Sequence, residues 1–292
     1  MDVSIIFVNY NTISLLTDAI DSALEKTIGV IYEIIVVDNA SNDNSRKILS
    51  DKYQSNVIYI ALPENIGFGR ANNEGMKIAK GRNVFLLNPD TILQNNAVKI
   101  LSDYLDQNEG VGVVGANLYN EDGSAQPCFC HYYPSIGYEL SNLFHLLFLY
   151  NREVFNYTEV PKKVSRVVGA AMMIKKGVIN KTGMFDARFF MYAEEDEWCF
   201  RISKSGYTIF NLPQAKITHL DGKSFQFSAE RQKRKLEGLR TFYRVSYSSF
   251  YCKMLRLVEY LTIMSRLIIS KMSNNIEKLN YWKFMYNNRD WK

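Results

Sequence analysis

The segment FLLNPDT, residues 85–91, joins an apolar run to an amide, a proline ring and a carboxylate. The run has the composition of a strand buried on both faces of a parallel sheet. Pro89 fixes the backbone and offers no amide donor, so the chain must leave the sheet there. We therefore expect Asp90 to point into a crevice beyond the strand, where carboxylates commonly bind divalent cations. A helix-capping role is disfavoured, because TILQ separates Asp90 from the helix expected near Asn95.

Apolar runs and helix-like segments alternate on either side of this stretch. The runs are VSIIFV at 3–8, EIIVVD at 33–38, NVIYIAL at 56–62, NVFLLN at 83–88 and VGVVGA at 111–116. Helical patterns occupy about 13–26, 43–53, 69–80 and 95–107. Continuous Val, Ile and Leu runs separated by helices predict βαβ units, that is, an α/β fold with a parallel sheet covered on both faces. The first 115 or so residues are expected to form one doubly wound unit.

Polar side chains follow each of the first four predicted strands. They are Asn9, Tyr10 and Asn11, then Asp38, Asn39 and Ser41, then Glu64 and Asn65, and finally Asn88 and Asp90. Each cluster alone could be a turn or a helix N-cap, for which Asn and Asp are well suited. Four clusters at the carboxyl edge of one sheet favour a ligand site instead.

Positive charge is concentrated in the last quarter of the chain. The 292 residues carry a net charge of +5, yet residues 221–292 hold 15 Lys and Arg against 6 Asp and Glu. This asymmetry suits an anionic surface, either a membrane or a nucleic acid. The start MDVSIIFVNYN lacks the basic segment of a secretory signal, so we expect a cytoplasmic protein with four reduced cysteines. CFCH at 128–131 has no second cluster with which to complete a zinc site.

The pattern changes after residue 116. ELSNLFHLLFLYNREVF at 139–155 has helical spacing, and we interpret it as a packed helix, with a membrane-facing or acceptor-facing helix as the alternative. Two short strands are expected around YTIFNL and KITHL. From 229 onward the chain is helical, basic and aromatic, and Glu259 and Arg266 favour an interfacial helix over a transmembrane one.

Six motifs together resemble glycosyltransferase family 2, in particular its rhamnosyltransferase-like branch. They are VNYN at 8–11, VVDNASNDNS at 36–45, ENIGFGRANNEG at 64–75, LLNPDT at 86–91, VGAAMMIKK at 168–176 and GMFDARFFMYAEEDEWCFR at 183–201, and THLDGKS at 218–224 closes the pattern. The resemblance implies the A-type glycosyltransferase fold, with a Rossmann-like nucleotide-binding half and a mostly parallel central sheet. It also implies a nucleoside-diphosphate sugar donor, Mg²⁺ or Mn²⁺, and inversion at the anomeric carbon.

The resemblance assigns roles to individual residues. In the family the fourth strand ends in Asp-x-Asp, whose second Asp reaches the metal and whose first reaches the ribose. Here the counterpart is Asn88-Pro89-Asp90, so Asp90 keeps the metal role while Asn88 brings no charge. His219 aligns with a histidine that completes the metal shell. In the acidic run 194–197, Glu195 aligns with the catalytic base, Asp196 is the second candidate for it, and Glu194 is expected to hold sugar hydroxyls.

Further positions are assigned to the nucleotide sugar. Asp38 corresponds to the residue that meets a pyrimidine base, which would belong to thymidine or uridine. Arg70 is available to the diphosphate, and Gly67 and Gly69 are expected to allow close backbone approach. The full set expected to bind the donor is Val8, Tyr10, Asn11, Asp38, Asn65, Gly67, Arg70, Asn72 and Asn88.

The expected domains are a catalytic region at 1–225, divided into a nucleotide-binding half (1–116) and an acceptor-binding half (117–225), and a basic helical region at 226–292. The expected activity is transfer of rhamnose or another hexose to a hydroxyl of a saccharide acceptor, which could be lipid-linked, in bacterial surface polysaccharide synthesis. The tail would rest on the inner membrane face through Arg231, Lys233, Arg234 and Lys235. Packing of the tail on its own domain or on a second subunit is the alternative.

Other function classes fit less well. A non-catalytic nucleotide-sugar-binding subunit of a polysaccharide assembly complex is the main alternative, because Asn88 replaces the first Asp. GFGRAN lacks the third glycine of a dinucleotide fingerprint. VNYNTISL lacks the Gly-rich loop of a sugar nucleotidyltransferase. A nucleic-acid partner is not expected, because the basic tail carries no recognised motif.

Overall fold

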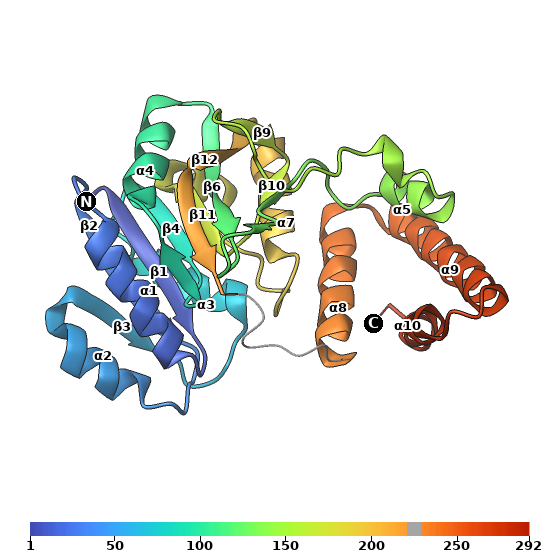
Figure 1. Cartoon of the computed structure of the whole chain (residues 1–292), viewed down its shortest axis with the longest axis horizontal. Coiled ribbons are helices and arrows are strands. Elements are labelled where there is room, and N and C mark those ends of the chain that lie inside the picture. The colour runs from blue at the N-terminus through green and yellow to red at the C-terminus, as the bar shows by residue number, and fades with distance from the viewer. Residues whose placement is uncertain (221–228, 292) are drawn as a thin grey trace.

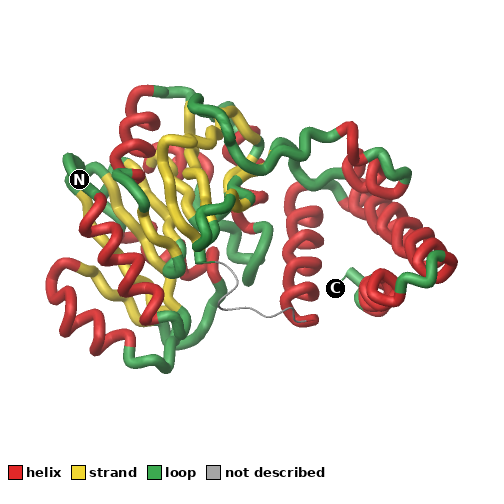
Figure 2. The backbone as a smooth tube through the Cα atoms, in the orientation of Figure 1, coloured by secondary structure: helices red, strands yellow, loops and turns green. Residues whose placement is uncertain are grey.

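The computed structural model describes residues 1–220 and 229–291. It shows a mixed α/β body on one side and a group of helices on the other (Figures 1 and 2). The segment DGKS of the THLDGKS motif lies outside the described residues. The N-terminus lies on the side of the α/β body away from the helices, and the C-terminal end lies beside helices α8 (Ala229–Ser246) and α10 (Ile276–Asn287) (Figure 1).

The first half follows the predicted alternation closely. Its elements are β1 (Val3–Asn9), α1 (Ile13–Lys26), β2 (Tyr32–Asp38), α2 (Ser45–Tyr53), a 3₁₀ turn η1 (Gln54–Asn56), β3 (Val57–Ala61), α3 (Phe68–Ile78), β4 (Asn83–Leu87), β5 (Thr91–Leu93) and α4 (Ala97–Gln107). Strands β3, β2, β1 and β4 are parallel neighbours in that order. Every residue of β1 and β4 is buried, so both faces of the sheet are covered.

The second half of the chain completes the same sheet. Its elements up to residue 219 are β6 (Val111–Tyr119), β7 (Ala125–Gln126), β8 (Phe129–Cys130), α5 (Ile136–Leu143), a 3₁₀ turn η2 (Leu147–Leu149), β9 (Lys162–Val164), β10 (Arg166–Val167), β11 (Ala171–Lys175), α6 (Lys176–Thr182), α7 (Glu194–Lys204) and β12 (Thr208–His219). The main order is β3-β2-β1-β4-β11-β6-β12-β5.

Two predictions about the sheet were wrong. The first 115 residues do not form a self-contained unit, because β11 lies between β4 and β6 and pairs antiparallel with both. β11 is fully apolar over Ala171–Ile174 and fills this buried position. The two short strands expected near 208–219 are one strand, β12, with an irregularity between Leu212 and Lys216. Pro213 lies in that irregularity, where a missing amide donor is tolerated.

The pairing of β5 with β12 places two polar side chains side by side. The strands are antiparallel with Thr91 opposite His219, and the Leu220 amide donates to the Asp90 carbonyl at 2.8 Å. The three residues of β5 that pair with β12 therefore hold the turn after Pro89 against the end of β12.

The C-terminal helices pack on their own chain. They are α8 (Ala229–Ser246), α9 (Ser249–Met272) and α10 (Ile276–Asn287), and α8 stands between the sheet and the other two (Figure 1). Phe189 shares a hydrophobic cluster with Phe242, Tyr243 and Leu255. A buried ion pair between Arg240 and Glu259 at 2.7 Å holds α8 to α9.

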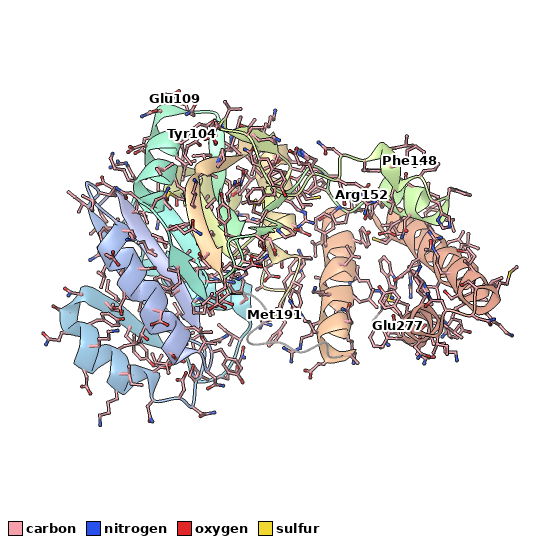
Figure 3. The ribbon with its side chains drawn as sticks, viewed as in Figure 1. Tyr104, Glu109, Phe148, Arg152, Met191 and Glu277 are labelled. Atoms are coloured by element: carbon pink, nitrogen blue, oxygen red, sulfur yellow. The ribbon has the colours of Figure 1, made fainter. Side chains whose placement is uncertain are left out.

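Helix α5 is more exposed than we predicted. The packed helix expected from 139–155 is instead a short helix with no buried residue, followed by η2. The rings of Phe144 and Phe148 are 64% and 72% exposed, and Phe148 lies at the outer end of the helical group (Figure 3). α5 contacts α9, its Tyr138 ring packs on the rings of Tyr132 and Tyr150, and its Glu139 accepts from the Tyr243 hydroxyl of α8 at 2.9 Å. Within the residues described, no helix has both the length and the hydropathy needed to cross a bilayer.

Gly238 allows α8 to approach the segment before α7. A Cβ at this position would lie 2.2 Å from the Tyr192 carbonyl oxygen and 3.2 Å from that of Met191. Tyr192 and Ala193 both have positive φ, at 72° and 67°, so this segment is already conformationally restricted. The close approach therefore depends on a residue without a side chain.

We expect Gly238→Ala to lower the free energy of unfolding by about 1–3 kcal/mol, because the methyl group must displace backbone atoms. Gly177→Ala is the matched control, since a Cβ there meets nothing within 4 Å. Urea denaturation of the full chain measures both. Equal stability of the two variants would show that α8 does not press on Tyr192.

Candidate active site

A cavity of about 680 Å³ lies at the carboxyl ends of β1 and β4. It is lined by six of the residues expected to bind donor or metal, namely Val8, Tyr10, Asn11, Asn65, Asn88 and Asp90. The loops that follow β1, β3 and β4 are thereby brought together, as the strand-end clusters indicated. Asn39, which belongs to the polar cluster after the second strand, also lines the cavity, as do Asp43, Phe68 and Met191, to which no individual role was assigned.

Two buried asparagines hold the loops of this cavity in place. Asn9 donates to the hydroxyls of Ser41 and Ser45 at 2.9 and 2.7 Å. Asn39 donates to the Asn65 side chain at 2.9 Å and accepts from the Ile66 amide at 2.9 Å. Buried amides of this kind must be satisfied, so the loops after β1, β2 and β3 move little relative to one another.

Some expected donor residues lie behind the wall of the cavity. Asp38 is buried and accepts hydrogen bonds from the Ser41 amide at 2.8 Å and the Tyr59 hydroxyl at 2.5 Å. Burial, helped by this hydrogen bond, raises the pKa of Tyr59. Asn72 is buried and donates to the Phe68 carbonyl within α3 at 3.1 Å. Contact of Asp38 and Asn72 with a nucleotide therefore stays a prediction.

Gly67 and Arg70 have different surroundings. Gly67 has a φ of 89°, and a Cβ there would lie 2.2 Å from the Phe190 carbonyl oxygen. The close approach that glycine permits is thus to segment 189–191 of the same chain. Gly69 is similar, with Phe185 at 3.1 Å from its Cβ position. The Arg70 Nε is buried without a hydrogen-bond partner, so this guanidinium still has donor capacity.

Asp90 and His219 come together at the edge of the cavity. His219 Nε2 lies 3.4 Å from Asp90 Oδ1, and that oxygen is buried without a hydrogen bond. On the other side of the ring, Nδ1 lies 2.7 Å from the amide oxygen of Gln126. The Gln126 amide nitrogen donates to Asn120 Oδ1 at 3.0 Å, which fixes the orientation of this amide.

This arrangement fits a divalent cation. An amide oxygen only accepts, so His219 Nδ1 must carry a proton and the neutral ring presents its Nε2 lone pair toward Asp90. Asn88 Oδ1 is a further buried acceptor without a partner. The described residues contain no cluster of three or more His, Cys, Asp and Glu side chains able to bind a metal, so Asp90 and His219 would supply only part of the shell. Diphosphate oxygens and water commonly complete such shells around Mg²⁺.

Two of the four acids at the start of α7 form ion pairs with arginines, and two do not. Asp196 pairs with Arg166, and Glu197 pairs with Arg201 at 2.7 Å. Arg201 also donates to the Met184 carbonyl at 2.9 Å, so that pair holds the loop before α7. Glu194 and Glu195 have no ion pair with any described residue, and Glu194 Oε2 is buried without a hydrogen bond.

Burial and neighbouring charge shift the protonation of these acids. Burial, followed by the charge of Asp196, raises the pKa of Glu195 to about 7, with Arg166 opposing. Burial, followed by the charge of Glu195, raises the pKa of Glu194 well above its ordinary value. Burial also raises the pKa of Asp196, and Arg166 limits the change. A carboxyl group that titrates near neutral pH is well matched to proton transfer.

Short contacts connect the acids to the wall of the cavity. The Cβ position of Gly169 lies 3.8 Å from the Glu195 carboxyl carbon and 3.7 Å from the ring of Phe68, which lines the cavity. Next to Gly169, the Ala170 carbonyl accepts from the Asn88 amide at 2.9 Å. Residues 169–170 therefore lie between Glu195 and the segment Asn88-Pro89-Asp90, although Glu195 itself does not line the cavity.

Residues 4–181 match the protein family described as Glycosyl transferase family 2. The chain belongs to this family. One relative is the low-salt glycan biosynthesis hexosyltransferase Agl10 of Haloferax volcanii. The two chains are 27% identical over 212 residues, which cover 71% of this chain and 64% of the relative. This chain is also 27% identical over 212 residues to the poly(ribitol-phosphate) beta-N-acetylglucosaminyltransferase TarP of Staphylococcus aureus, covering 71% and 59%.

A third relative is the N-acetylglucosaminyl-diphospho-decaprenol L-rhamnosyltransferase of Mycobacterium tuberculosis. This family 2 chain is 23% identical to it over 208 residues, which cover 64% of this chain and 66% of the relative. The chain therefore spans less than two thirds of the length of each of these three curated relatives.

Solved structures confirm the predicted A-type fold. GalNAc-T7 with UDP, GalNAc and Mn²⁺ superposes with a TM-score of 0.63 at 17% identity, covering 82% of this chain and 47% of that one. Residues 1–349 of S. aureus TarS superpose with a TM-score of 0.56 at 15% identity, covering 99% and 92%. The predicted family and fold class are thus both confirmed.

We expect Gln126→Leu to weaken Mn²⁺ binding roughly 10–100-fold, because the ring of His219 loses the acceptor that fixes its tautomer and orientation. Gln126→Glu keeps an acceptor oxygen and should retain most of the affinity. Titration of the chain with Mn²⁺ in the presence of UDP, followed by electron paramagnetic resonance, measures the free metal. Wild-type affinity in Gln126→Leu would contradict the proposed part of His219 in metal binding.

Proposed function

We propose that this chain transfers a hexose, with inversion, from a nucleoside-diphosphate sugar to a hydroxyl of a saccharide acceptor in bacterial cell-surface glycan synthesis. One observation carries the proposal: Asp90 and His219 offer free acceptor atoms at a cavity whose wall adjoins an unpaired carboxyl, Glu195. The relatives named above, which include a hexosyltransferase and a rhamnosyltransferase, support the reaction class.

The donor would occupy the 680 Å³ cavity. Tyr10, which is 48% exposed, and Asn11 would flank a thymidine or uridine. The free donors of Arg70 are available to the diphosphate. Asp90 and His219 would hold Mg²⁺ or Mn²⁺, which when bound neutralises charge on the leaving diphosphate.

Glu195 would act as the base. It would take the proton from the acceptor hydroxyl as the oxygen attacks the anomeric carbon from the face opposite the diphosphate. Asp196 would position the start of α7 through Arg166, since its carboxylate is already paired. Glu194, with its raised pKa, would stay protonated and could donate to a sugar hydroxyl.

A non-catalytic nucleotide-sugar-binding subunit remains the second candidate, because Asn88 brings no charge to the metal site. Such a subunit would have no need for an unpaired buried carboxyl beside the cavity, which costs stability. Glu194 Oε2, which is buried without a hydrogen bond, and the raised pKa of Glu195 therefore favour an enzyme.

We further propose the division into a catalytic region, 1–225, and a basic helical region, 226–292. Two of the residues expected to meet a membrane, Arg234 and Lys235, place their charged groups over the rings of Phe190 and Tyr192. The turn between α9 and α10 is a better candidate for contact with the inner membrane face. Met272 and Ile276 there are 80% and 71% exposed, and Lys271 and Lys278 flank them.

We expect Glu195→Gln to lower the rate of sugar transfer by ~10²–10⁴-fold while UDP binding is retained, because the amide cannot accept the proton. A panel of thymidine- and uridine-diphosphate sugars with saccharide acceptors, followed by chromatography, measures transfer. Calorimetry measures UDP binding. Normal turnover of Glu195→Gln would rule out this residue as the base.

The pH dependence provides a separate test of Glu195. A base acts in its deprotonated form, so kcat/KM should rise as the pH rises through about 7, the raised pKa of Glu195. Glu197→Gln is the control, because it removes only the ion pair with Arg201 and should leave this inflection in place. A rate that is flat between pH 5.5 and about 8.5 would contradict the assignment, since an ordinary Glu titrates near pH 4.3.

We expect Met272→Ser/Ile276→Ser/Lys271→Ser/Lys278→Ser to reduce flotation of the chain with anionic liposomes, because apolar burial and headgroup attraction are both removed. Leu24→Ser/Ile48→Ser/Lys26→Ser/Lys47→Ser, on α1 and α2, is the matched control. Equal flotation of both variants would remove the proposed membrane contact at the α9–α10 turn.

A further inference from the structure

A second cavity, of about 400 Å³, adjoins the donor cavity. It lies between segment 188–191, α8 and residues 287–290. Met191 lines both cavities, so they adjoin at this residue. Figure 3 shows Met191 between the α/β body and α8. A molecule in the second cavity would therefore lie next to a sugar donor in the first.

The second cavity is strongly basic. Five basic residues line it against two acidic ones: Arg188, Lys233, Arg234, Arg240 and Arg244, with Glu237 and Asp290. Arg188, Arg234 and Arg240 form ion pairs with Asp186, Glu230 and Glu259. Lys233 and Arg244 have no carboxylate partner in the described part of the chain, so their charges are available to a ligand.

A third cavity, of about 450 Å³, continues from Arg244. Its lining residues are Arg244, Tyr247, Ser249, Cys252, Lys253, Arg256 and Trp291, of which none is acidic. Arg256 lies over the ring of Trp291 at 5.7 Å. Arg244 lines both the second and the third cavity, as Met191 lines both the donor cavity and the second. The three cavities are therefore neighbours in series.

We propose that the second and third cavities form a track for a polyanionic glycan chain, which delivers its terminal hydroxyl past Met191 to the donor cavity. This inference deepens the proposed function by naming the acceptor class. Lys233, Arg244, Lys253 and Arg256 would contact phosphate or carboxylate groups of the chain. Tyr247 and Trp291 offer aromatic surface beside these charges, as sites for partly polar ligands commonly do.

The position of these charges favours a glycan over a lipid surface. A protein binds a flat layer of lipid headgroups through side chains that protrude from its surface. These basic residues instead line the second and third cavities, the first of which adjoins the donor cavity at Met191. A single-stranded nucleic acid would be attracted by the same charges, and it is an outcome of the test rather than part of the proposal.

The test measures binding of short oligosaccharide probes to the full chain by calorimetry, without donor. The probes are a glycerol-phosphate oligomer, an oligogalacturonate, a neutral malto-oligosaccharide and a single-stranded oligonucleotide. The track variant is Lys233→Glu/Arg244→Glu/Lys253→Glu. The control, Lys47→Glu/Lys80→Glu/Lys283→Glu, changes the net charge equally at exposed lysines that line none of the three cavities.

We expect at least one of the two anionic glycans to bind the wild type and the control alike, and the neutral one to bind neither. The track variant should lose roughly tenfold in affinity for each charged contact removed. Binding of both anionic glycans would indicate a site that accepts either phosphate or carboxylate groups. Binding of only one would show which of these two groups the site recognises. UDP affinity should be unchanged, which verifies that the variant is folded.

The proposal is overturned if neither anionic glycan binds, if the control weakens binding as much as the track variant, or if the oligonucleotide binds more tightly than both glycans. Loss of anionic-liposome flotation in the track variant with unchanged glycan binding would assign these charges to a membrane instead. Because binding is measured without donor, intact glycan binding in a chain that transfers no sugar would contradict the proposed enzymatic function and leave the track standing.

Discussion

The short antiparallel pairing of β5 with the end of β12 is the constraint on which the candidate site depends. It forces the turn after Pro89 to lie against His219, and it brings two groups with free acceptor atoms to within 3.4 Å of each other. Without a cation or a proton between them, two lone pairs at this distance repel. The backbone ladder and the buried hydrogen bond to Gln126 hold them there. The fold thus holds two acceptor groups close enough to share a proton or a cation between them.

A similar conflict exists at the start of α7. Four consecutive acids sit at one helix terminus, where the helix dipole favours negative charge but burial does not. Arg166 and Arg201 compensate two of them, and Arg201 also donates to the Thr182 carbonyl at the end of α6. The uncompensated pair, Glu194 and Glu195, faces the side on which Phe68 and Gly69 of α3 lie. The two acids that form ion pairs thus directly follow, along the chain, two acids that form none with a described residue.

Sequence patterns predicted the local architecture well where hydrophobic periodicity was strong. The helices at 13–26 and 97–107, and the strands between them, follow from runs of buried apolar residues. The position of β11 could not be predicted, because pairing between β4 and β6 depends on tertiary contacts that AMMIK does not encode. α5 differs from the prediction for the same reason: its spacing fits a packed helix, but how far its residues are buried depends on tertiary contacts, and in the structure none of them is fully buried.

The candidate site shows the same division between local and tertiary information. Residues directly after strands, such as Tyr10, Asn88 and Asp90, line the cavity as their places in the sequence indicated. Asn72 and Gly67, which lie in a helix or at its start, make contacts within the protein that their places in the sequence did not indicate, and their expected contact with the donor stays a prediction. Gln126 and Met191 gave no signal, because each acquires its role only from a residue distant in sequence.

The seat of α8 on Tyr192 and Ala193 links the two ends of the molecule. These residues hold a left-handed backbone immediately before Glu194, and Gly238 lets α8 press directly on them. The backbone that leads into the first turn of α7 is therefore packed against α8, so a displacement of α8 would be felt first by the two residues that precede the four acids.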